Sequence, residues 1–230
     1  MKKSTQSIIT DDTGDSFQSC GFRRSVRRQV TGRYLLFLPA GYATQAKNYP
    51  AIFFLHGAGE RGSNLDDVKR HGLPKVVATQ PNFPFIVVAP QCPARRWWSL
   101  EMLDTLYEEV SANYRLDQQR IYLTGLSMGG FATWSWAIER PNRFAAIVPV
   151  CGGSNPLLAE RVAHLPVWIF HGARDDIVPV KASQEMARAL RRCGARPKLT
   201  IYPEAGHDSW TETYQNPALY RWLLKHHKTQ

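Results

Sequence analysis

Several features that mark particular classes of protein are missing from this chain of 230 residues. No apolar run approaches the roughly 20 residues that a helix needs to cross a bilayer. The first residues are basic and polar, without the apolar stretch of a secretory signal. The four cysteines lie far apart and form no C-x-x-C pair, which argues against a zinc ribbon or a thioredoxin-like redox site. We therefore expect no stable membrane insertion and a cytoplasmic location.

Metal-binding and nucleic-acid-binding motifs are also missing. The sequence has no H-E-x-x-H, the helical motif of zinc proteases. The net charge of +10 is spread along the chain and is accompanied by no DNA- or RNA-binding motif, so a solvated basic surface explains it better than a nucleic-acid partner. We expect no metal, no organic cofactor and no nucleic-acid partner, and the sequence leaves the oligomeric state open.

What is present is a regular alternation of strands and helices, with no internal repeat. Residues 1–20 are polar and aperiodic and predict a flexible tail, and residues 21–230 predict one domain. Short apolar runs predict strands at 33–39, 51–55, 85–89, 121–123, 144–151, 166–170 and 198–202, and an arginine-rich strand pattern predicts an exposed edge strand at 23–30. Helical spacing predicts helices near 67–79, 100–114, 131–138, 180–193 and 217–225. This order predicts an α/β fold, with a mostly parallel, twisted sheet of about eight strands and helices on both faces.

The most specific motif is Gly125-Leu126-Ser127-Met128-Gly129, which lies between a predicted strand and a predicted helix. In that context G-x-S-x-G forms a nucleophile elbow, a tight turn that raises the serine hydroxyl above the edge of the sheet. The two glycines avoid collisions between the turn and its neighbours. We predict that Ser127 is a nucleophile, and a plain Gly/Ser turn is the structural alternative.

A serine hydroxyl reacts only when a base takes its proton and an acid orients that base. Two later loops, each after a predicted strand, supply these residue types. His207 follows the last strand and is the predicted base. Asp175 and Asp176 compete for the acid, and the H-G-x-x-D-x-x-V-P spacing selects Asp175. His171, in a His-Gly turn like that of His56, is more consistent with fixing a loop.

The tetrahedral intermediate of such a reaction needs backbone N–H donors. We predict the N–H groups of Met128 and of Ala58, in the small-residue loop 56–59, with Gly59 as the alternative to Ala58. For the substrate we predict contacts with Trp98, Trp210 and Gln91, which lie in loops expected to converge on Ser127. Packing within the loops is the structural alternative for these side chains.

These stretches resemble the α/β-hydrolase superfamily. Within it, the chain is similar to the small phospholipase/carboxylesterase, dienelactone-hydrolase-like and "predicted peptidase" esterases. The matching segments are 55–62, 89–93, 97–98, 125–130, 170–175 with 178–179, and 206–210, and they span roughly residues 33–225. The resemblance implies the α/β-hydrolase fold and hydrolysis of carboxylic esters.

The sequence thus predicts a serine carboxylesterase that acts through an acyl-enzyme on small or medium soluble esters, with aromatic, feruloyl-type esters among the candidates. Only 14 residues, 152–165, separate two predicted strands where many lipases carry a cap, so we expect no large cap domain. The alternatives are a serine peptidase and a non-catalytic binding protein with the same fold.

Overall fold

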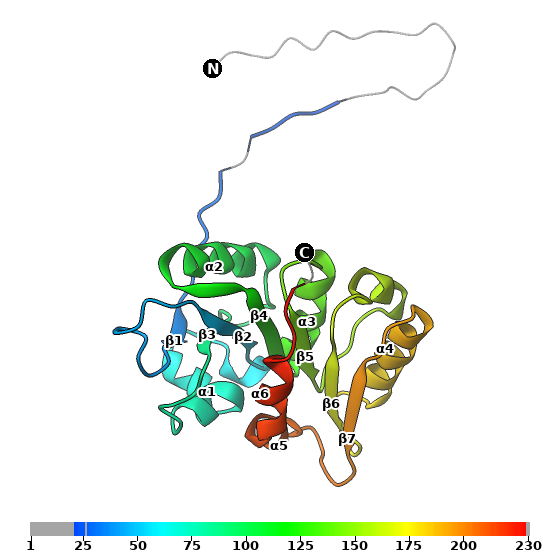
Figure 1. Ribbon diagram of the computed structural model, residues 1–230. Coiled ribbons are helices and arrows are strands. Elements are labelled where there is room, and N and C mark those ends of the chain that lie inside the picture. Colours follow the sequence, from blue (N-terminus) through cyan, green and yellow to red (C-terminus); the bar gives the residue numbers. More distant parts are fainter. Residues whose placement is uncertain (1–20, 26, 229–230) are drawn as a thin grey trace, which may run out of the picture.

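The computed structural model describes residues 21–25 and 27–228 (Figure 1). Its centre is a seven-stranded sheet with the order β1-β3-β2-β4-β5-β6-β7. β1 pairs antiparallel with β3, and every other pair is parallel. The strands are β1 (Tyr34–Phe37), β2 (Tyr49–Leu55), β3 (Ile86–Pro90), β4 (Leu116–Leu126), β5 (Ala146–Val150), β6 (Trp168–Gly172) and β7 (Lys198–Tyr202). The mostly parallel sheet predicted from the sequence is confirmed.

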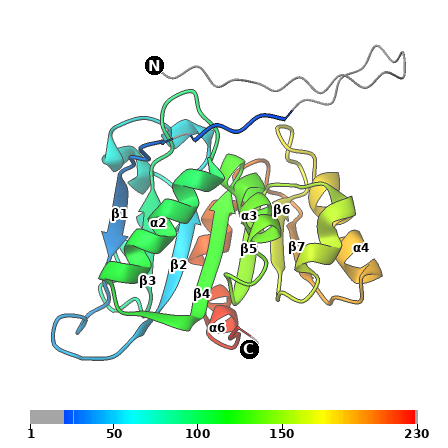
Figure 2. The same cartoon turned by 90° about the horizontal axis from the view of Figure 1, so that it is seen from above.

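Helices cover both faces of the sheet, as Figures 1 and 2 show. One face packs against α2 (Leu100–Asn113), α3 (Met128–Glu139) and α4 (Lys181–Arg192). The other face packs against α1 (Gly72–Val77), α5 (Trp210–Gln215) and α6 (Pro217–Leu223). Three 3₁₀ helices lie in loops: η1 (Ala58–Glu60), η2 (Leu65–Lys69) and η3 (Pro156–Val162). Because both faces are covered, the central strands are buried on both sides, which explains their continuous apolar runs.

One predicted strand is wrong. Residues 21–25 and 27–30 form no strand and are almost entirely exposed, so the described part of the sheet has seven strands instead of about eight. The arginine-rich segment has no apolar face to bury, and a strand without a pairing partner gains little. The predicted tail, residues 1–20, lies outside the described residues. Among the residues that are described, no helix combines the length and apolar composition needed to cross a membrane.

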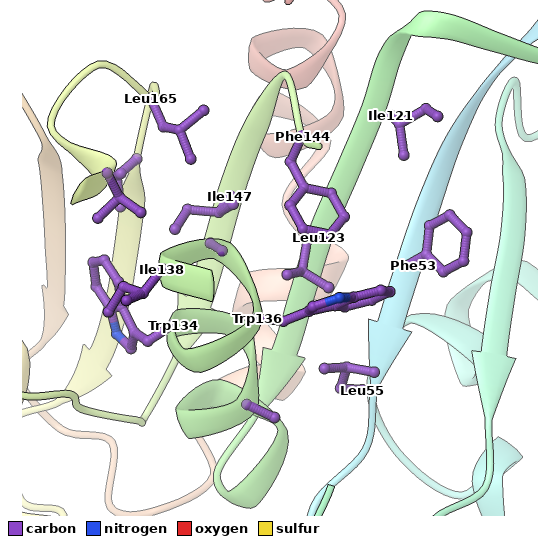
Figure 3. Packing of buried hydrophobic residues seen from close by; sticks show 14 of the residues in the cluster. Phe53, Leu55, Ile121, Leu123, Trp134, Trp136, Ile138, Phe144, Ile147 and Leu165 are labelled. Atoms are coloured by element: carbon purple, nitrogen blue, oxygen red, sulfur yellow. The ribbon is translucent and has the colours of Figure 1, made fainter. Parts of the chain in front are cut away.

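The helix that follows the predicted elbow, α3, is buried on almost every side. Trp134 and Trp136 have no exposed surface, and Figure 3 shows them pointing to opposite sides of the helix. Trp136 meets Phe53 of β2 edge to face, with ring centroids 5.7 Å apart. Burying a single large apolar side chain contributes about 1.5–3 kcal/mol. Both tryptophans belong to the core, and α3 is thereby fixed against the sheet.

A polar cluster ties α2 to α3 outside this core. Asp104 of α2 accepts hydrogen bonds from Trp136 Nε1 (2.9 Å), from Arg140 Nε (3.0 Å) and from Arg143. Burial by itself raises the pKa of Asp104, but the bonds from these donors outweigh it and hold the pKa below its usual range. The carboxylate therefore stays ionised over most of the pH range and joins the two helices.

Candidate active site

The turn between β4 and α3 has the backbone of a nucleophile elbow. Ser127 has φ +52° and ψ −116°, a conformation that residues with a side chain rarely adopt. A Cβ on Gly125 would lie 2.4 Å from the carbonyl oxygen of Gly129. A Cβ on Gly129 would lie 1.9 Å from the carbonyl oxygen of Leu55. Only glycine fits at both positions, so the sequence motif reflects close approach of three backbone segments.

Contacts from β5 hold the strained serine in place. The N–H of Ser127 donates to the Val150 carbonyl (3.0 Å) and contacts the Cys151 sulfur (3.3 Å). Cys151 itself has φ +40° and is fully buried. The sequence analysis missed this role for Cys151, although its place at the end of the strand beside the elbow is a usable signal.

The structure brings Ser127, His207 and Asp175 together. His207 Nε2 lies 2.9 Å from Ser127 Oγ, and His207 Nδ1 lies 2.8 Å from Asp175 Oδ2. The three residues come from the β4–α3 turn, the loop after β7 and the loop after β6. They meet because the carboxyl ends of parallel strands share one edge of the sheet. Asp176, the competing acid, is exposed and makes no hydrogen bond to His207 among the described residues.

Hydrogen bonds keep the Asp175 carboxylate charged. Its side chain is fully buried, and burial by itself raises the pKa. Bonds from His207 and from the backbone N–H groups of Val178 (2.8 Å) and Ile177 (3.0 Å) outweigh burial and lower the pKa. A charged carboxylate holds the proton of a neutral imidazole on Nδ1, so His207 Nε2 is free to accept the Ser127 proton.

The two predicted oxyanion donors begin helices. Ala58 is the first residue of η1 and is exposed, and Met128 is the first residue of α3. Within the described residues, neither N–H group donates to a protein acceptor. N–H groups in the first turn of a helix have no partner within that helix and favour negative charge nearby. Both donors are therefore available to a ligand, and their role stays a prediction.

His56 fixes the loop that carries Ala58. Its Nε2 accepts the Cys92 N–H (2.9 Å), so the ring proton lies on Nδ1, which donates to the Gly57 carbonyl (2.6 Å). Burial lowers the pKa of His56 to about 4, which keeps the ring neutral. In a trans peptide the C=O and N–H point in opposite directions. Anchoring the Gly57 carbonyl therefore aims the Ala58 N–H, and the loop-fixing interpretation of His56 is confirmed.

Arg61 and Trp98 brace the same loop. Arg61 Nε donates to the Ala58 carbonyl (2.9 Å), and Trp98 Nε1 donates to the His56 carbonyl (3.2 Å). The Trp98 ring packs against the His56 ring, with centroids 4.8 Å apart. Trp98 is only partly buried, so part of the residue is accessible to solvent. Its contact with substrate stays a prediction, and its bracing contacts agree with packing within the loops, the structural alternative.

Gln91 and Trp210, the other predicted substrate contacts, lie in different environments. Gln91 is only 4% exposed, and its amide donates to the carbonyls of Glu60 (2.9 Å) and Asn64 (2.8 Å). A buried amide with both hydrogens in use holds a loop, which favours the structural alternative, and the substrate role of Gln91 stays a prediction. Trp210 stands edge-on to His207, with centroids 5.2 Å apart, and is partly exposed. It remains a candidate wall of the site.

The relay residues also form a cluster of potential metal ligands among the described residues. Ligand atoms of Cys151, Asp175 and His207 lie within 4.8 Å of one another. Burial raises the pKa of the Cys151 thiol to about 12, so the thiolate that a metal prefers is scarce. Asp175 and His207 already bind each other. The donor set fits a metal poorly, and the expectation that no metal is needed stays a prediction.

Residues 95–219 match the model of the Dienelactone hydrolase family. This chain belongs to the dienelactone hydrolase family. The match covers the elbow and the loops of Asp175 and His207, and it makes the chain a hydrolase of the carboxylesterase type with the α/β-hydrolase fold. The superfamily resemblance read from the sequence is thus confirmed.

Individual relatives agree with this placement. A protein named probable feruloyl esterase C of Aspergillus niger is 27% identical, over 90% of this chain and 80% of its own length. A protein of the same name from Aspergillus terreus is 28% identical over 79% of this chain and 70% of its own. The crystal structure of a thermostable esterase superposes with a TM-score of 0.73 at 32% identity. It covers 84% of this chain, which spans 59% of that one.

Proposed function

We propose that this carboxylic-ester hydrolase works through a covalent acyl-serine formed on Ser127, and that aromatic esters of the feruloyl type are among its substrates. One observation supports the serine mechanism above all others. Two hydrogen bonds, of 2.9 Å and 2.8 Å, join the hydroxyl of a strained elbow serine to an imidazole and then to a buried carboxylate. This is the arrangement that makes a serine oxygen nucleophilic.

The steps follow from the atoms in place. Ser127 Oγ attacks the ester carbonyl while its proton passes to His207 Nε2, and the N–H groups of Ala58 and Met128 donate hydrogen bonds to the developing oxyanion. The imidazolium, held by Asp175, then protonates the departing alcohol. Water repeats the sequence on the acyl-serine, with His207 as base, and releases the acid. Each charged form has a partner that is in position beforehand, so little reorganisation is required.

The surroundings support small and aromatic esters over long lipids. Between β5 and β6 the chain forms only loops and the short η3, which is too little for a cap domain. Trp210 offers an aromatic edge beside His207, and Trp98 offers a second ring beside the Ala58 loop. Flat aromatic groups stack on such side chains. The two relatives named probable feruloyl esterase C support the same substrate class.

The serine mechanism is tested by labelling with a fluorophosphonate probe. We expect wild type and Ser135→Ala to label equally and Ser127→Ala not to label, and p-nitrophenyl acetate to give an acyl-enzyme burst only with the first two proteins. Ser135 is a matched control because it lies on α3, is exposed, and bonds only the carbonyl of Phe131. Equal labelling of all three proteins would contradict the proposal.

The substrate class is tested with a panel of esters and peptides. We expect methyl ferulate and p-nitrophenyl butyrate to be hydrolysed without a rise in rate above a substrate's micelle concentration, since no cap is present to open. Trp210→Leu should raise KM for methyl ferulate by about fivefold, corresponding to roughly 1 kcal/mol of lost stacking, and leave p-nitrophenyl acetate almost unchanged. Cleavage of short peptides without cleavage of any ester would instead favour the peptidase alternative.

A further inference from the structure

A second imidazole lies behind the carboxylate of Asp175. His171, the penultimate residue of β6, is fully buried. Its Nε2 lies 3.2 Å from Asp175 Oδ2 and 2.8 Å from the Val178 carbonyl. Its Nδ1 lies 2.7 Å from Ser183 Oγ on α4. The Asp175 oxygen that His171 approaches is the same one that binds His207.

The partners fix which nitrogen of His171 carries the proton. Both neighbours of Nε2 are acceptors, a carbonyl and a carboxylate, so Nε2 must carry the hydrogen. Nδ1 then accepts from the Ser183 hydroxyl. That hydroxyl also lies 3.2 Å from the Gly152 carbonyl, but its shorter contact is with the imidazole. Burial lowers the pKa of His171, which keeps the ring neutral and this proton arrangement stable near neutral pH.

We infer that His171 is a positioning residue whose Nε2–H, bonded to the Val178 carbonyl at 2.8 Å, is shared with Asp175 Oδ2 at 3.2 Å, so that one carboxylate oxygen faces two imidazoles and Ser183 sets the orientation of the second. This inference rests on the proposed function, because it assigns His171 to the relay that serves Ser127. The hydrogen-bonded chain then runs from Ser127 through His207, Asp175 and His171 to Ser183.

The shared oxygen has a consequence for the strength of the base. Three donors bond the carboxylate, namely His207 and the N–H groups of Ile177 and Val178, and the Nε2–H of His171 approaches it at 3.2 Å. The two backbone N–H groups bind Oδ1, whereas the two imidazoles approach Oδ2 and draw negative charge away from it. Removing the His171 donor leaves more charge facing His207 and stabilises the protonated form of that ring. The base then becomes protonated, and inactive, at a higher pH.

Few other charged groups face this cluster. Cys151 approaches from the end of β5, and its thiol, whose pKa burial raises to about 12, carries no charge. Asp208, beside His207, is exposed and accepts from Thr211. Lys181, at the start of α4, pairs at the surface with Glu185 (3.7 Å). The variants below alter none of these groups, so a change in the titration of His207 reports on Asp175.

The test compares His171→Met, which has no donor, with His171→Gln, whose amide nitrogen can reach the position of Nε2. The His207 ring is titrated by NMR, with its signals assigned from their loss in His207→Gln. We expect the titration midpoint to rise by about half a pH unit in His171→Met and to stay within about 0.2 unit of wild type in His171→Gln. The acid limb of kcat/KM should move in the same direction.

A purely structural role gives another outcome. Both variants would then lose stability while the midpoint of His207 stayed where wild type has it, and that result would overturn the inference. If His171→Met does not fold, Ser183→Ala takes its place and should give a smaller rise in the same direction, with an unchanged midpoint counting against the relay. Because the NMR titration needs no substrate, it tests the relay even if Ser127→Ala keeps its activity and the proposed function fails.

Discussion

Replacing Gly129 by alanine sets two physical effects against each other. Gly129 lies in the first turn of α3, and alanine is favoured over glycine in a helix by about 1 kcal/mol. Helix propensity alone therefore predicts a more stable protein. The added Cβ, however, would lie 1.9 Å from the Leu55 carbonyl oxygen and 2.7 Å from that of His56. The outcome depends on which effect is larger.

The steric effect is larger, because the clash cannot be relieved locally. Relief requires a movement of more than about 1 Å, since Cβ atoms in proteins essentially never come within 3.0 Å of such an atom. Bending a bond angle by about 15° moves a Cβ by only about 0.4 Å and already costs about 4 kcal/mol. The backbone of β2, which is fully buried, must shift instead. We expect a net loss of at least about 3 kcal/mol, or a Tm lower by about 6–12 °C in a chain of this size.

The assay is urea and thermal unfolding of Gly129→Ala beside Gly59→Ala. Gly59 is a matched control because a Cβ there meets nothing within 4 Å, although it lies in the neighbouring oxyanion loop. We expect the control to melt within about 2 °C of wild type, as surface substitutions usually do. A Tm for Gly129→Ala equal to or above that of wild type would refute the reasoning, because helix propensity would then have prevailed over close approach of the backbone.

Three further predictions concern strain and buried charge. Ser127→Gly should abolish activity yet raise stability by about 1 kcal/mol, since glycine relieves the backbone strain at φ +52°; a lower Tm would contradict this. Asp104→Asn should cost about 2 kcal/mol at pH 7 by leaving Arg143 unpaired. The pKa of Asp104 is lowered in the folded protein. The stability difference between Asp104→Asn and wild type, measured by urea unfolding, should therefore shrink as the pH falls through that lowered pKa. Burial lowers the pKa of His56 to about 4, so the protein should lose about 3 kcal/mol of stability as the pH falls from 6.5 to 4. His56→Gln should remove that pH dependence.

The sequence predicts this fold well where burial alone decides the structure. β3 spans Ile86–Pro90, all buried and within one residue of the expected 85–89, and the elbow follows from spacing because no other residue fits at Gly125 and Gly129. The sequence-based predictions fail where contacts with distant segments decide whether an element forms. Residues 23–30 show a strand-like local pattern, yet a strand forms only if another strand pairs with it. The short α5, residues 210–215, buries only Thr213 and Tyr214 and has no periodic apolar signal.

The same distinction separates the parts of the site. Ser127, Asp175 and His207 could be proposed from residue type and position, because each must follow a strand of the parallel sheet at the same edge. The side chain of Gln91 also follows such a strand, but it turns inward to the Glu60 and Asn64 carbonyls. The direction of a side chain, the tautomer of a histidine and the sharing of a hydrogen bond depend on residues far apart in the chain. No local sequence pattern encodes them.

Preorganisation of the site therefore rests on residues that the motifs leave unassigned. The elbow glycines permit the strain at Ser127, but the bond to Val150 maintains it. The His-Gly turns show a similar division. In each, glycine allows two segments to approach closely, and the histidine fixes the orientation of one functional group: the Ala58 peptide for His56, and the Asp175 carboxylate for His171. The His56 ring must be neutral to accept the Cys92 N–H, and burial lowers its pKa to about 4. Acid that protonates His56 should thus disturb the geometry of the site before it unfolds the sheet.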